Sequence, residues 1–161
     1  MATRYIVTSD PLFSSGPIGK DPTRIEVLFG QEGEFVRVRT PGHGERVAIS
    51  TEQGVRFLDA MEALRPEELP DVVDTPPGEM DFLDGWTLRG RIQKDDGTRH
   101  TFAVRTRYLP REYAARQWAF FSLVLRLARE VVRLPETVQW MKHFWMMADL
   151  DEPAAPSAHQ P

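Results

Sequence analysis

Arginines that alternate with apolar residues are the most chemically capable group in this sequence. Arg37 and Arg39 alternate with valines, and two later segments repeat the pattern. Side chains of a β-strand point alternately to opposite faces of the sheet, so this spacing places the arginines of each strand on one face. A guanidinium group binds carboxylates and phosphates through two parallel hydrogen bonds. If these strands share one sheet, the pattern predicts a water-facing surface that binds an anionic ligand or partner through Arg37, Arg39, Arg89, Arg91, Arg105 and Arg107.

Like charges directly opposite one another in a sheet repel, so these arginines need a source of negative charge. One interpretation is internal: Glu26, Glu34 and the acidic segment 66–84 lie over the arginines. The other is external, with an anionic partner supplying the charge. The segment 66–84 holds four prolines and seven acids with no lysine or arginine, which predicts an irregular loop. A hypothesis that joins the two interpretations makes this loop a mobile cover that competes with an outside anion for the arginine face.

A second candidate surface is aromatic and lies near the C-terminus. Tryptophan, phenylalanine and methionine side chains crowd the expected last helix, and such residues are enriched in protein interfaces. One interpretation buries them in the core, and the other places them against a partner or a second copy of the chain. The interface hypothesis assigns contact residues Trp140, Phe144, Trp145 and Met147. It predicts that Trp145→Asp abolishes association and leaves the fold intact.

No spacing in the sequence indicates catalysis or metal binding. The four histidines, His43, His100, His143 and His159, are not spaced as in zinc sites, and the chain has no cysteine. Neither a phosphate-binding glycine loop nor a nucleophile elbow occurs. We therefore expect no metal, no cofactor and no enzymatic activity, with an enzyme acting on a small anionic ligand held by the arginines as the alternative.

These residues must be positioned by an α+β fold. Six strands are expected at 4–8, 24–29, 34–40, 46–50, 85–93 and 99–108, and helices at 51–64, 111–134 and 136–150. The short connections favour a mainly antiparallel sheet, covered on one face by the short middle helix and two C-terminal helices. Val55, Leu58 and Met61 are expected on the buried side of the middle helix. Residues 1–150 form one domain and 151–161 a flexible Pro/Ala-rich tail.

The overall composition narrows the functional classes. The chain has 161 residues and a formal charge of −4, which disfavours nucleic acid as the partner. Phe102 and Tyr108 alternate with the arginines, so they are expected on the opposite face, away from any base-stacking surface. The most apolar stretch, 118–125, is too short to span a bilayer, so we expect a cytoplasmic protein without a membrane segment.

A non-enzymatic protein-binding module is therefore the leading functional hypothesis. In general character the chain is similar to toxin immunity proteins, assembly chaperones and small subunits of bacterial or phage assemblies. Its partner would be another protein or a second copy of itself. Binding of a small anionic ligand is the second hypothesis, and binding of nucleic acid by the arginine face is the third.

Overall fold

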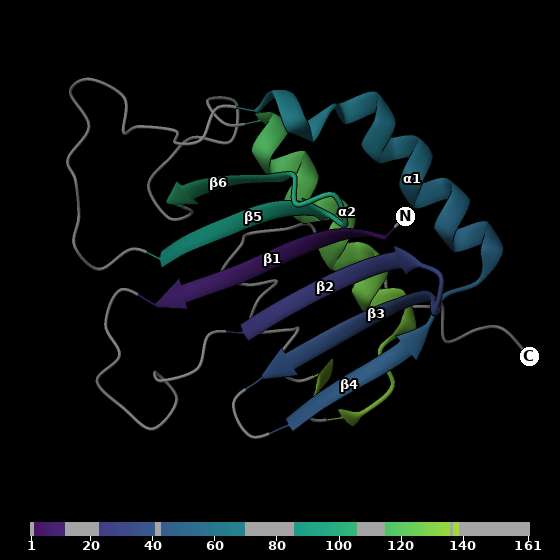
Figure 1. Cartoon of the computed structure of the whole chain (residues 1–161). Coiled ribbons are helices and arrows are strands. Elements are labelled where there is room, and N and C mark those ends of the chain that lie inside the picture. Colours follow the sequence, from purple (N-terminus) through teal and green to yellow (C-terminus); the bar gives the residue numbers. More distant parts are fainter. Residues whose placement is uncertain are drawn as a thin grey trace, which may run out of the picture.

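Six strands and two α-helices make up the described part of the chain (Figure 1). The computed structural model describes residues 2–11, 23–40, 43–69, 86–105, 115–135 and 137–138. The strands are β1 Thr3–Pro11, β2 Thr23–Gly30, β3 Gly33–Thr40, β4 His43–Ala48, β5 Trp86–Lys94 and β6 Arg99–Arg105. The helices are α1 Thr51–Leu64 and α2 Ala115–Val131, with a short 3-10 turn, η1 Pro66–Glu68, after α1. Among these residues no helix is long and apolar enough to cross a membrane.

The strands form one antiparallel sheet in the order β4-β3-β2-β1-β5-β6. β1 lies in the middle, where Tyr5 pairs with Val27 of β2 on one side and Ile92 of β5 on the other. Tight turns join β2 to β3 and β5 to β6. Gly33 and Gly97 adopt positive φ values of 119° and 87° in these turns, a conformation that glycine reaches without a steric penalty. The antiparallel α+β prediction is confirmed.

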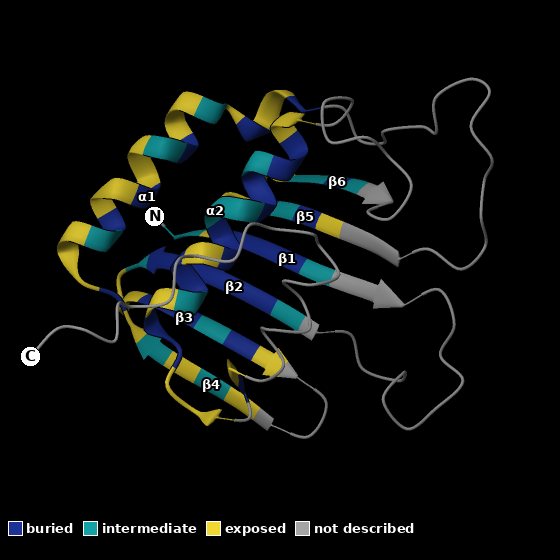
Figure 2. Ribbon diagram, turned by 180° about the vertical axis from the view of Figure 1, so that it is seen from behind, coloured by how far each residue is buried: buried dark blue, intermediate teal, exposed yellow. Residues whose placement is uncertain are grey.

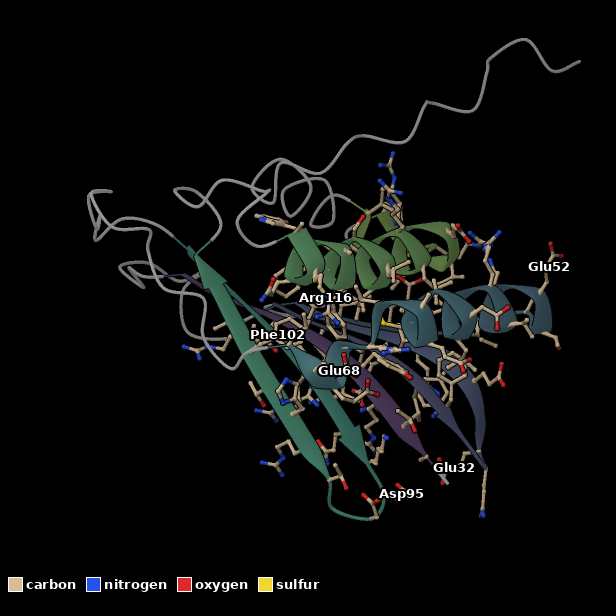
Figure 3. The ribbon with its side chains drawn as sticks, turned by 90° about the horizontal axis from the view of Figure 1, so that it is seen from above. Glu32, Glu52, Glu68, Asp95, Phe102 and Arg116 are labelled. Atoms are coloured by element: carbon tan, nitrogen blue, oxygen red, sulfur yellow. The ribbon has the colours of Figure 1, made fainter. Side chains whose placement is uncertain are left out.

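One face of this sheet is dry and carries the core. Alternate residues of the strands on this face, among them Val7, Val27 and Phe102, are fully buried. α2 crosses this face and α1 lies beside α2 (Figures 1 and 3). Phe102 packs edge-on against Phe120 of α2, with ring centroids 4.9 Å apart. Gly90, its neighbour on β5, leaves the space that this ring fills: a Cβ there would lie 2.5 Å from Cε2 of Phe102.

α1 begins where the sequence predicts, but it buries a different side. Ser50 caps the helix by accepting a hydrogen bond from the Gln53 amide at 3.1 Å, and the Gln53 side chain accepts one from the Ser50 amide. The expected buried side was wrong for two residues, because Val55 is 53% and Leu58 is 37% exposed. The buried residues are Gly54, Phe57 and Met61. Figure 2 shows the exposed side of α1 facing away from the sheet.

Helix α2 ends at Val131, before the expected end at 134, and is buried over much of its circumference. The expected start at 111 lies outside the described residues. Trp118 and Leu125 are buried along with the stripe that faces the sheet, which includes Phe121 and Val124. A helix that is apolar on most sides belongs in an interior, as observed here. Of the expected last helix, the amide of Val138 donates to the Leu134 carbonyl at 2.9 Å. Its remainder, the expected tail 151–161 and most of the acidic segment lie outside the described residues.

Candidate functional site

The register places the arginines of several strands on the face of the sheet opposite the helices. Paired residues of adjacent strands point to the same side, and the two series Arg37–Glu26–Ile6–Arg91 and Arg39–Arg24–Thr8–Arg89 run across β3, β2, β1 and β5. Four of the predicted arginines therefore share a face, namely Arg37, Arg39, Arg89 and Arg91. Arg105 occupies a register position of the same face, opposite Thr87, but its side chain is outside the described residues, as is all of Arg107.

Four further arginines belong to this surface and were not predicted. They are Arg4 on β1, Arg24 on β2, Arg46 on β4 and Arg99 on β6. Arg4, Arg24 and Arg46 each stand alone in their strands, so no alternation marks them in the sequence. Arg99 shares β6 with Arg105, six residues further on and at a register position of the same face. The strand register is the signal that assigns them, because Arg46 pairs with Arg37 and Arg24 pairs with Arg39. We call the eight described side chains the arginine face: Arg4, Arg24, Arg37, Arg39, Arg46, Arg89, Arg91 and Arg99.

Beneath the guanidinium groups lies a small apolar floor. Ile6, Leu28 and Phe35 point to the arginine face and are 2%, 8% and 5% exposed. The guanidinium carbon of Arg46 stands 3.6 Å from the centroid of the Phe35 ring, a cation–π contact. Long arginine side chains can cover apolar neighbours with their methylene groups and keep their charge in water. The face thus combines buried apolar contacts with charge held at its surface.

One carboxylate, that of Glu26, lies among the described side chains of this face. Glu26 is 3% exposed, and its oxygens lie 3.4 Å from Arg4 Nη1 and 3.8 Å from Arg24 Nη2. The expectation that Glu34 also covers the arginines is wrong, because Glu34 pairs with Phe29 and belongs to the helix-covered face. Its Oε2 lies 2.6 Å from where a Cβ of Gly54 in α1 would be.

The described carboxylates balance only part of the positive charge on the arginine face. Within the described part of the chain, no ion pair joins Arg37, Arg39, Arg91 or Arg99 to an acid. Burial lowers the pKa of Arg91, and the positive charges of Arg99 and Arg24 lower it further. Eight arginines against one glutamate give a formal charge of +7. Since the whole chain carries −4, all other residues together carry −11, including Asp10 and Arg105 at register positions of the same face and the residues that the structure does not describe.

The described start of the acidic segment lies on the opposite side of the molecule. Glu68 stands 3.8 Å from Arg65 and 3.9 Å from Arg116 of α2, next to the helices (Figure 3). The Leu69 carbonyl is 2.7 Å from Nε2 of His100, a residue of the helix-covered face. Residues 66–69 thus do not cover the arginines, and the expected cover by 70–84 lies outside the described residues.

The other candidate residues fall mainly outside the described ranges. This applies to the interface residues Trp140, Phe144, Trp145 and Met147, and to His143 and His159. Among the residues that the structure describes, no group of three or more histidines and acids could hold a metal ion. In comparisons with protein-family models, curated protein sequences and solved structures, nothing matches this chain.

Proposed function

We propose that this chain is a protein-binding module whose arginine face docks on an acidic surface of a partner protein. The observation that carries the proposal is the charge of that face, where eight arginines accompany one glutamate. Both described helices lie on the opposite face of the sheet, and neither of them covers the arginine face. A partner that brings carboxylates would relieve the repulsion between paired arginines such as Arg24 and Arg39.

The breadth of the face favours a macromolecular partner over a small anion. Neighbouring strands lie about 4.8 Å apart, so arginines from β4 to β6 spread over roughly 24 Å. A small anionic ligand could contact a few of them and would leave the others uncompensated. Protein interfaces are enriched in arginine and depleted in lysine, and the described side chains of this face include no lysine. The apolar floor of Ile6, Leu28 and Phe35 adds the apolar component that such interfaces contain.

The same face is poorly suited to single-stranded nucleic acid. Base-stacking surfaces present aromatic rings to the ligand beside their positive charges. Here the one described aromatic residue of the face, Phe35, is buried beneath Arg46. The net charge of −4 on the whole chain also disfavours a long polyanion as the ligand. These two observations favour a partner whose negative charge is confined to a patch.

Affinity purification from the native host with matched charge reversals tests the proposal. Arg39→Glu/Arg99→Glu reverses two exposed charges on the arginine face, and Arg126→Glu/Arg133→Glu reverses two exposed charges elsewhere on the surface. We expect the wild-type chain and the second variant to retain a partner that is identified by mass spectrometry and lost with the first variant. The complex should survive nuclease treatment and form again from the purified proteins with an affinity that falls as salt increases.

Two results would overturn this function. A partner retained equally by both charge-reversal variants would place the binding surface elsewhere on the molecule. A complex that nuclease dissolves would assign the arginine face to nucleic acid instead. Circular dichroism of both variants, with urea unfolding, provides the control for folding.

A further inference from the structure

The outer side of α1 carries acids beside exposed apolar residues. Glu52, Asp59 and Glu62 are exposed and follow one another along one side of the helix, with Val55 between the first two. Val55 and its neighbour Leu58 are 53% and 37% exposed. Within the described part of the chain no ion pair joins these three acids to a base. We call these five residues the outer row of α1, and Figure 3 shows the first of them, Glu52, pointing away from the strands.

Helix α1 presents this row on a fixed support. Its first turn carries a capping box, and at its last turn Nη2 of Arg116 donates to the Leu64 and Arg65 carbonyls at 2.7 and 3.1 Å. On the buried side of the helix, Phe57 packs against the Tyr5 ring at a centroid distance of 5.2 Å. A helix that is already formed loses less conformational entropy on binding than a segment that folds on its partner. The outer row can therefore dock without rearrangement of the helix.

The outer row and the arginine face are complementary in charge and in size. The row has three acids and no base, whereas the face has eight arginines and one described glutamate. From Glu52 to Glu62 the row extends about 15 Å, because a helix rises about 1.5 Å per residue. The arginine face extends roughly 24 Å across its strands, so the whole row fits within it. Val55 and Leu58 would then lie against the arginine methylene groups that cover the apolar floor.

We propose that the acidic surface bound by the arginine face is the outer row of α1 in a second copy of this chain. This inference rests on the proposed function, because it uses the same face. The contacts of Phe57 with Tyr5 and Phe29 place α1 on the helix-covered side of the sheet. The two complementary surfaces therefore lie on opposite sides of the sheet and cannot meet within one molecule. A closed pair would need its partner on both sides at once, so the copies join head to tail, as rings or filaments do.

Sedimentation velocity over a range of protein concentrations tests this assembly. In low salt we expect the wild-type chain to form species larger than a dimer, which about 0.5 M salt should return to monomers. Asp59→Gln/Glu62→Gln removes two charges from the outer row and should raise the dissociation constant about tenfold or more. The matched control, Glu32→Gln/Glu67→Gln, removes two exposed charges outside α1 and should assemble as the wild type does.

Mixing two variants shows which surfaces meet. Arg39→Glu/Arg99→Glu blocks the arginine face and keeps the outer row, whereas Asp59→Gln/Glu62→Gln weakens the row and keeps the face. Each variant alone should stay mostly monomeric at a concentration where the wild type assembles. Together they should form a one-to-one pair that does not extend, because its ends offer only a blocked face and a weakened row. Circular dichroism and urea unfolding of each variant provide the control for folding.

The possible outcomes separate this inference from the proposed function. A wild-type chain that stays monomeric at every concentration in low salt, or that stops at a dimer, would overturn head-to-tail assembly and leave the arginine face to another acidic protein. Equal assembly by the wild type and either surface variant would exclude that surface from the contact, and a mixture that stays monomeric would show that the two surfaces do not meet. The proposed function fails separately, if Arg39→Glu/Arg99→Glu retains the partner captured from the host.

Discussion

Replacing Glu26 with glutamine should reveal how much the chain depends on its internal counter-ion. Glu26→Gln keeps the size of the side chain and removes the negative charge that Arg4 and Arg24 share. At an effective dielectric constant of about 20, charges 3.4 Å apart attract one another by about 5 kcal/mol. Taking the carboxylate out of water costs several kcal/mol in the opposite direction. The net contribution is a small difference between these two large quantities.

The exposure of the two arginines limits the loss further. Their side chains are 44% and 38% exposed, so both can turn toward water once the carboxylate is gone. Breaking a fully buried ion pair typically costs about 3–5 kcal/mol, and we therefore expect about 1–2 kcal/mol for Glu26→Gln. If the free energy of unfolding decreases by about 2 kcal/mol per molar urea, the urea concentration at the unfolding midpoint should fall by about 0.5–1 M.

Urea unfolding at low and high salt measures this effect without adding a charged denaturant. In about 1 M salt the screening length drops to about 3 Å, so repulsion among the unbalanced arginines weakens and the difference between variant and wild type should shrink. Glu130→Gln removes an exposed partner of Arg56, 2.8 Å away, and should cost less than about 1 kcal/mol. Equal stability of Glu26→Gln and wild type at low salt, or a difference that salt leaves unchanged, would refute the counter-ion role.

Three further predictions concern the fold. Gly90→Ala should cost about 1–3 kcal/mol in urea unfolding, because the new methyl group meets the buried Phe102 ring, and an unchanged midpoint would contradict the close packing. Ser50→Ala removes the capping box of α1 and should lower the free energy of unfolding by about 1 kcal/mol. Ser50→Asn can accept the same hydrogen bond and should recover most of that free energy. Burial, together with the charge of Glu67, raises the pKa of Tyr5 above 10.0. As the pH rises, the Tyr5 hydroxyl therefore loses its proton at a lower pH in the unfolded chain than in the folded protein. The free energy of unfolding should then fall as the pH rises above about 10. Tyr5→Phe should flatten that fall, and an equally steep decline in the variant would show that other groups cause it.

The alternation of the sequence predicted part of the arginine face and could not predict the rest. Arg37 with Arg39 and Arg89 with Arg91 are two residues apart, so each pair must share a face whatever its strand pairs with. Arg46 has no such companion in its strand. The face of the sheet on which Arg46 lies follows only from its pairing with Arg37. Strand pairing depends on turns and contacts that the alternation of the sequence does not encode. The role of these residues in binding stays a prediction.

The incorrect prediction of the buried side of α1 has a physical origin different from that of the arginines that were missed. Val55 with Leu58 and Gly54 with Phe57 have the same three-residue spacing, so helical periodicity admits both pairs. The aromatic contacts decide between them. Phe57 meets the rings of Tyr5 and Phe29 at centroid distances of 5.2 and 5.8 Å, and Gly54 lets the helix approach Phe29 closely. A glycine that weakens a helix in isolation is here what allows the helix to pack.

The position of β1 explains why the charge of the face exceeds what either half of the sequence indicates. The strands β2 to β4 form one meander, and β5 with β6 forms a separate hairpin later in the chain. Each unit carries arginines that could be ordinary surface residues. β1 pairs with β2 on one side and β5 on the other, and its Ile6 pairs with both Glu26 and Arg91. This one strand therefore merges two arginine-bearing units into a single face. On that face it places Glu26 on one side of Ile6 and Arg91, which has no ion pair within the described part of the chain, on the other.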